Sequence, residues 1–152
     1  MRPARACDGN VWIQTVDKTD MFEWKPEYSI HVQGVDAQHK ELFRLAESLR
    51  VAMMAGQGAV AVGKTLDRLA DYTSVHFAYE ERIMQQCCYP DYEAHKAIHD
   101  DLIRQVFELQ GQYRRGQTIT VQVLHFLKNW LVDHIANQDA RLGPYVAKNR
   151  TA

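Results

Sequence analysis

Four stretches of the chain carry apolar residues at every third or fourth position, the spacing that places side chains on one face of an α-helix. Short connections make successive helices neighbours, so we predict an all-α fold, an antiparallel up-down-up-down four-helix bundle. The first helix is predicted to begin after Asp36 as N-cap and to end at Gly56 and Gly58, and the second to begin at about Ala59. Pro90 marks the turn before the third helix, which ends within Gly111 to Gly116. The fourth helix is predicted to begin at about Thr118 and to stop at Gly143-Pro144.

Two regions precede the first predicted helix. Residues 1–20 lack sustained periodicity, and we predict a loosely ordered N-terminal arm there. Between Phe22 and Val35, apolar residues follow in irregular order around Pro26 and Gly34, which indicates an extended segment laid over the core. We therefore expect a single bundle domain over residues 21–148.

Each apolar stripe is interrupted by at least one histidine. These residues are His39 on the first stripe, His76 and Glu80 on the second, His95 and His99 on the third, and His134 on the fourth. Residues four apart on a helix lie about 40° apart around its axis, so each of the two pairs faces one direction. Buried imidazoles and carboxylates without partners would cost several kcal/mol each, and a metal removes most of this cost. The sequence therefore predicts a buried metal site.

Asp139 is the least regular candidate ligand. It follows His134 by five residues, about 140° around an ideal helix, so it reaches the site only from the rim of the face or through a local distortion of the helix. With Asp139 the candidates exceed the four ligands of a tetrahedral zinc, which indicates two metals. Mixed imidazole and carboxylate ligation suits iron. If both carboxylates and a solvent-derived oxygen bridge two ions, the ion with fewer histidines keeps an open position.

Two further histidines act as controls. His125 is half a turn out of phase with His134, so we expect it to face solvent. His31 precedes the first helix and occupies no stripe, and we expect it to contact solvent or local hydrogen-bonding groups.

Composition narrows the class of protein. The chain has 18 Lys and Arg against 19 Asp and Glu, so its formal charge of -1 gives no electrostatic reason to expect nucleic acid or an anionic membrane as partner. No apolar run is long enough to span a bilayer, and no signal peptide is recognisable. Three cysteines without framework or zinc spacing fit a reducing compartment, and we predict a cytoplasmic protein.

Five segments of the sequence resemble bacterial hemerythrins, with all seven candidate ligands at that family's spacings. The segments are WKPEY at 24–28, VDAQHK at 35–40, HFAYEE at 76–81, YPDYEAHKAIH at 89–99 and WLVDHIANQD at 130–139, and the likeness extends to about Val146. The resemblance implies reversible O2 binding at a non-haem di-iron centre, with two Fe ions joined by an oxo or hydroxo bridge. It also supports Asp139, whose five-residue interval from His134 is the family's own.

The resemblance also implies a role for each ligand. His95, His99 and His134 would hold the coordinatively filled iron, and His39 and His76 the five-coordinate iron that binds O2 as hydroperoxide. Glu80 and Asp139 would bridge the two ions. The expected activity is O2 carriage, storage or delivery by a monomer, with an O2-consuming enzyme as a possible recipient and no enzymatic activity of its own.

Two alternative functions remain at this point. One is an O2 or redox sensor that acts through a partner. The other is a di-iron peroxidase or oxidase, although carboxylate-rich di-iron enzymes use Glu-x-x-His pairs and no Glu stands three residues before any histidine here.

The chain departs from the family pattern where glycine is common. His31 occupies one such position and Cys88 another, and at Cys88 we expect that the helix end does not use a left-handed cap. Cys87 and Cys88 are interpreted as ordinary thiols. We expect Glu81, Lys40 and Lys96 to lie on solvated faces.

Overall fold

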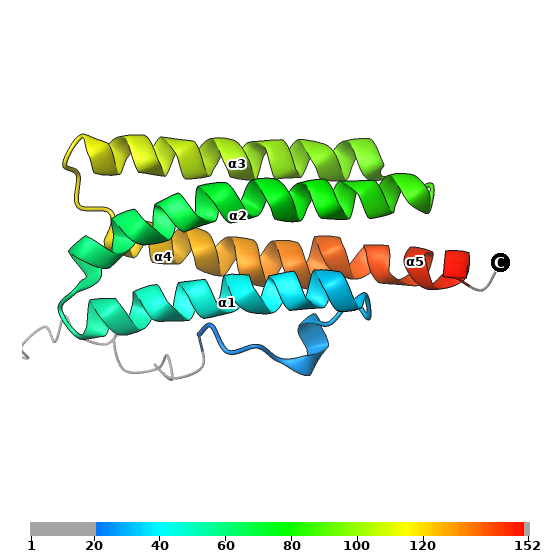
Figure 1. The fold of residues 1–152 in the computed structure, drawn as a ribbon, viewed down its shortest axis with the longest axis horizontal. Helices are drawn as coiled ribbons and strands as arrows, with labels where there is room; N and C mark the ends of the chain where they lie inside the picture. Colours follow the sequence, from blue (N-terminus) through cyan, green and yellow to red (C-terminus); the bar gives the residue numbers. More distant parts are fainter. Residues whose placement is uncertain (1–20, 151–152) are drawn as a thin grey trace, which may run out of the picture.

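The computed structural model describes residues 21–150, in which four helical rods pack side by side with alternating direction (Figure 1). This confirms the predicted up-down-up-down bundle, while the predicted N-terminal arm lies outside the described residues. The rods are α1 (Gln33–Met54), α2 (Gly58–Gln86), α3 (Tyr92–Arg114) and a fourth that combines α4 (Thr120–Lys128), the π-helix η3 (Asn129–Gln138), the 3-10 turn η4 (Asp139–Arg141) and α5 (Leu142–Arg150). No helix within the described residues is long and apolar enough to cross a membrane.

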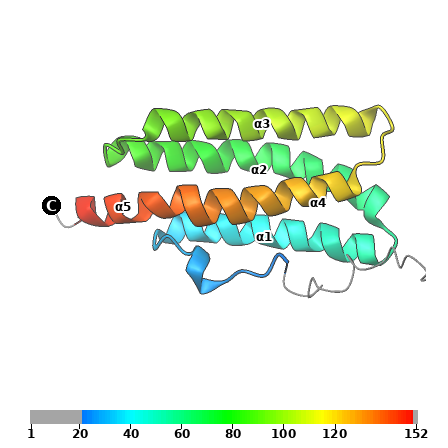
Figure 2. The same cartoon turned by 180° about the vertical axis from the view of Figure 1, so that it is seen from behind.

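The fourth rod does not stop at Gly143-Pro144, so that predicted boundary is wrong. The rod continues to Arg150, and Figure 2 shows α4 and α5 as parts of one rod across the back of the bundle. Pro144 lies in the first turn of α5, where a backbone N–H has no partner within the helix and its loss costs nothing. Gly143 is needed for packing, since a Cβ there would lie 2.5 Å from the backbone oxygen of Ile30.

The start of α1 also differs from the prediction. The helix begins at Gln33, and Asp36 lies in its first turn instead of capping it. The Asp36 carboxylate accepts hydrogen bonds from the backbone N–H of Ile30 (2.9 Å) and the hydroxyl of Ser29 (2.6 Å). Asp36 therefore ties the segment after the 3-10 turn η2 (Pro26–Tyr28) to the helix that follows it.

Two residues without glycine's freedom adopt left-handed backbone conformations. Cys88 has φ 51° and His31 has φ 60°. After Cys88, the N–H of Tyr89 donates to the carbonyl of Met84 (2.9 Å), and the N–H of Cys88 donates to that of Gln85 (3.3 Å). This pair of bonds is the left-handed termination of an α-helix, so the expectation that Cys88 would prevent it is wrong.

The interior of the bundle contains two apolar clusters. The larger one, which we call the large core, includes Leu42, Leu49, Leu66, Leu69, Phe77, Val106, Val123, Leu127 and Leu131. The smaller one, the small core, consists of Ile30, Val32, Val35, Met84, Cys87, Tyr89, Leu142 and Val146 and lies at the α2–α3 turn. Buried histidine and carboxylate side chains lie near the starts of α1 and α3, near the end of α2, and on η3 and η4.

Candidate metal centre

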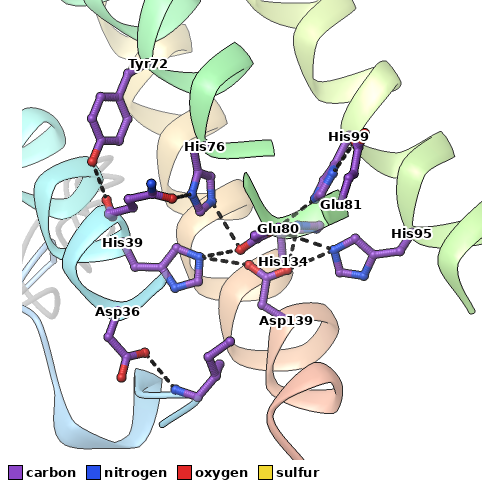
Figure 3. A network of polar contacts seen from close by, with 12 residues as sticks. Asp36, His39, Tyr72, His76, Glu80, Glu81, His95, His99, His134 and Asp139 are labelled. Atoms are coloured by element: carbon purple, nitrogen blue, oxygen red, sulfur yellow. Dashed lines mark hydrogen bonds and ion pairs between the residues drawn. The ribbon is translucent and has the colours of Figure 1, made fainter. Parts of the chain in front are cut away.

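The structure brings all seven candidate ligands together in the bundle interior. Each is at most 4 % exposed, and all four rods contribute at least one side chain (Figure 3). We call these residues the polar cluster: His39, His76, Glu80, His95, His99, His134 and Asp139. His31 and His125, the two controls, are exposed.

The π-helix η3 explains how Asp139 reaches the cluster. In a π-helix the backbone N–H bonds to the carbonyl five residues earlier, and the N–H of Asp139 donates to the carbonyl of His134 in this way. Residues five apart therefore share a face, and His134 Nε2 lies 3.0 Å from Asp139 Oδ1. The five-residue interval that conflicts with an ideal α-helix fits the local distortion that the chain adopts.

The cluster divides into two overlapping groups of possible metal ligands. His95, His99 and His134 form the three-histidine group, and His39 and His76 the two-histidine group. Glu80 and Asp139 belong to both, and within each group the candidate ligand atoms lie within 4.8 Å of one another.

Each carboxylate turns one oxygen toward each group. Glu80 Oε1 lies 3.0 Å from His39 Nε2 and 3.3 Å from His76 Nε2, whereas its Oε2 lies 3.2 Å from His99 Nε2. Asp139 Oδ2 lies 3.1 Å from His39 Nε2, and its Oδ1 lies 3.0 Å from the Nε2 atoms of both His95 and His134. The two carboxylates are therefore placed to bridge two centres.

Most of these short contacts are not hydrogen bonds. The Nε2 atoms of His76, His95, His99 and His134, together with Glu80 Oε2 and both oxygens of Asp139, are buried without a hydrogen-bond partner among the described residues. Ligand atoms about 2.1 Å from one ion and at right angles to each other are about 3.0 Å apart, because they face the ion instead of one another. The spacing and the unpartnered atoms therefore fit metal ions held within the cluster.

Electrostatics keep the carboxylates charged. Burial and the neighbouring Asp139 oppose the charge of Glu80, but His76, His39 and His99 outweigh them and lower its pKa to about 2. Burial also opposes the charge of Asp139, and its contacts with His134, His39 and His95 hold the pKa well below the ordinary value. Both residues can therefore serve as anionic ligands without first losing a proton.

The two histidines of the smaller group differ in charge. Burial lowers the pKa of His76 to about 4, which leaves its lone pair available to a metal. Burial would also lower the pKa of His39, yet the close carboxylates of Asp139 (3.1 Å) and Glu80 (3.0 Å) raise it to about 9. Metal binding at His39 therefore displaces a proton.

Three contacts around the cluster were not predicted from the sequence. His76 Nδ1–H donates to Gln38 Oε1 (2.8 Å), and His99 Nδ1–H donates to Glu81 Oε1 (3.0 Å). The Phe77 ring stacks on His99 with centroids 3.9 Å apart. Glu81 was expected on a solvated face, but its side chain is only 20 % exposed and turns toward α3. The sequence offered one indication of these contacts: Gln38, Phe77 and Glu81 are each adjacent to a candidate ligand.

Comparison with known proteins decides the family. A family model described as "Hemerythrin HHE cation binding domain" matches residues 31–146, a range that contains the whole polar cluster. The chain belongs to the hemerythrin family. Among curated hemerythrins, the bacteriohemerythrin of Stenotrophomonas maltophilia is 34 % identical over 78 % of this chain and 77 % of its own length. The bacteriohemerythrin of Methylococcus capsulatus is 36 % identical over 78 % of this chain and 90 % of its own.

Solved hemerythrin structures are similar to this chain in fold as well as in sequence. A crystal structure of wild-type hemerythrin is 35 % identical, with a TM-score of 0.73 over 82 % of this chain and 97 % of that one. The hemerythrin family implies an iron centre, and the polar cluster is able to bind metal.

Proposed function

We propose that the polar cluster holds two iron ions and that the chain binds O2 reversibly at this pair. The division of the carboxylate oxygens carries the proposal, since Glu80 and Asp139 each turn one oxygen to the two-histidine group and the other to the three-histidine group. A single ion in either group would leave buried carboxylate oxygens and imidazole nitrogens of the other group without partners, which is costly.

The two groups would give the ions unequal numbers of ligands. The three-histidine group, with one oxygen each from Glu80, Asp139 and a solvent-derived bridge, would supply six ligands to one ion. The two-histidine group, with the second carboxylate oxygens and the same bridge, would supply five to the other. O2 is therefore expected to bind on the side of His39 and His76. A reduced iron pair held by these residues would supply the two electrons that O2 takes up on binding and would recover them when O2 leaves. Mixed nitrogen and oxygen ligation beyond four donors favours iron over tetrahedral zinc.

Apolar side chains around the cluster would protect this reversibility. Leu42, Leu131 and Ile135 are fully buried, and Phe77 covers one face of His99. Such a wall keeps water and acids away from the iron pair and favours release of O2 over permanent oxidation of the iron. We class the chain as a binding protein and not as an enzyme.

The wider role that we propose is O2 carriage, storage or delivery inside the cell. The ligand is O2, the recipient is an O2-consuming enzyme, and the protein acts as a monomer in the cytoplasm.

Optical titration tests the proposal. The iron-loaded, reduced protein is titrated with O2, then deoxygenated and titrated again, with iron measured per chain. We expect two iron ions per chain and a charge-transfer band that appears with O2, disappears on deoxygenation and returns in the second cycle. A first exposure that oxidises the iron permanently, or a content of one iron per chain, would contradict the proposal.

A further inference from the structure

The two histidine groups differ in what lies behind them. In the two-histidine group, the acceptor for His76 Nδ1–H is the neutral amide oxygen of Gln38. In the three-histidine group, the acceptor for His99 Nδ1–H is the carboxylate of Glu81. The buried Nδ1 atoms of His39 and His134 have no partner among the described residues, so this contrast rests on two hydrogen bonds.

Each acceptor is next to a candidate ligand in the sequence. Gln38 lies on α1 immediately before His39, and its backbone carbonyl accepts a hydrogen bond from the hydroxyl of Tyr72 (3.4 Å). Glu81 follows Glu80 on α2, and Lys96, whose charge also acts on Glu81, directs its hydrogen bonds to Asp100. The Glu81 carboxylate therefore keeps its hydrogen bond to His99.

An acceptor behind a metal-binding imidazole changes how strongly the other nitrogen donates to the metal. A carboxylate draws the Nδ1 proton toward itself, which makes Nε2 a stronger donor and favours the more highly charged state of the metal. An amide oxygen fixes the same tautomer and ring orientation but adds no negative charge.

We propose that Gln38 and Glu81 are positioning residues that tune the two halves of the iron site unequally. Glu81 acts through His99 and favours the ferric state in the three-histidine half. Gln38 acts through His76 and leaves the two-histidine half easier to reduce. This tuning rests on the proposed function, and it sets the balance between holding O2 and releasing it.

Two reciprocal variants separate charge from hydrogen bonding. Glu81→Gln keeps an acceptor behind His99 but removes its charge, so the reduction potential of the iron pair should become more positive and O2 should be released more easily. Gln38→Glu adds a charge behind His76 and should shift the potential in the opposite direction, with faster permanent oxidation by O2. A tenfold change in ferric preference corresponds to about 59 mV for a one-electron couple.

Glu108→Gln is the matched control. It also removes one negative charge, but Glu108 is exposed on α3 and its contact is with Arg104. Its potential should equal that of the wild type. Glu81→Ala, which also removes the acceptor, should weaken iron binding about 10- to 100-fold.

Nitrogen NMR of the metal-free protein tests the hydrogen bonds separately from iron chemistry. In the wild type, Nδ1 of His76 and of His99 should each carry a hydrogen-bonded proton, and for His99 this hydrogen bond should be lost in Glu81→Ala and kept in Glu81→Gln. If wild type and variants bind two irons and O2 reversibly while Glu81→Gln and Gln38→Glu leave the potential unchanged, the tuning is wrong and the proposed function stands. If the wild type does not bind two irons, the proposed function itself fails.

Discussion

The large core and the polar cluster occupy the same four rods but are held together by different contacts. In the large core, side chains such as Leu49, Leu69 and Leu127 are fully buried and need only shape to fit one another. In the polar cluster, equally buried side chains are ionisable, and each depends on several others for its partners. The large core can therefore fix the spacing of the helices without a metal, and the polar cluster uses that spacing.

This difference predicts how the two regions respond to substitution. Loss of one apolar side chain removes packing energy at one place. Loss of one ligand changes the charge balance of the whole cluster and leaves other buried groups unpaired. Stability and metal content should thus respond separately to changes in the two regions.

The largest effect is expected from His99→Ala. This change removes a nitrogen of the three-histidine group and leaves Glu81 without its acceptor role, so the protein should no longer hold two irons per chain. Breaking such a buried charged network costs about 3–5 kcal/mol when one partner is lost. Iron analysis and thermal unfolding before and after treatment with a chelator measure both effects.

His125→Ala is the control for that experiment, because His125 is exposed and on the outer side of α4. It should keep two irons and the unfolding temperature of the wild type. Equal loss of iron in both variants would show that the polar cluster does not define the metal site.

A second prediction concerns the large core. Leu69→Ala should lower the free energy of unfolding by about 2–5 kcal/mol, because Leu69 is fully buried and the cavity would not close completely. Iron content should remain at two per chain. Urea unfolding measures the first quantity, and Val75→Ala, at a 66 % exposed position of the same helix, should change it by less than about 0.5 kcal/mol. Loss of iron in Leu69→Ala would mean that the two regions are not separable.

A third prediction tests how tightly the end of the bundle next to the polar cluster is packed. Gly143→Ala should destabilise the fold by about 1–3 kcal/mol, since the added Cβ would meet the backbone oxygen of Ile30, which has no freedom to move aside. Gly111→Ala is the control within α3, where the nearest atom is Nη1 of Arg115, the end of a flexible side chain. It should be neutral or stabilising by up to about 1 kcal/mol. Thermal unfolding of both variants in the same metal state checks the contrast, and an unfolding temperature for Gly143→Ala equal to the wild type's would contradict it.

Periodicity carried the prediction furthest where one face of a regular helix decides burial. It predicted the bundle and located six members of the polar cluster, because a spacing of four keeps His76 with Glu80 and His95 with His99. Periodicity did not predict the position of Asp139, because a calculation at 3.6 residues per turn treats the whole segment as an α-helix. The π-helix η3 depends on backbone hydrogen bonds that such a calculation does not include.

Contacts between side chains on different helices could not be predicted from the sequence either. Glu81 and His99 are 18 residues apart, and Gln38 and His76 are 38 apart, so each pair depends on how two helices are rotated about their axes. Two predicted helix boundaries were wrong for another reason. Asp36 and Gly143 have the residue types of a cap and a stop, but Asp36 bonds to the preceding segment and Gly143 permits close packing.

Cys88 provides the smallest predicted effect. Its left-handed backbone is unfavourable for any residue with a Cβ, whereas glycine adopts it without strain but loses more freedom on folding. Cys88→Gly should therefore stabilise the protein by about 1 kcal/mol or less. For a chain of this size, that corresponds to a rise in unfolding temperature of at most about 2–4 °C. Cys88→Ala removes the same thiol but retains the Cβ and should leave the temperature near that of the wild type. An equal rise in both variants would assign the effect to the thiol. Iron content should stay at two per chain, because Cys88 is exposed and is not a member of the polar cluster.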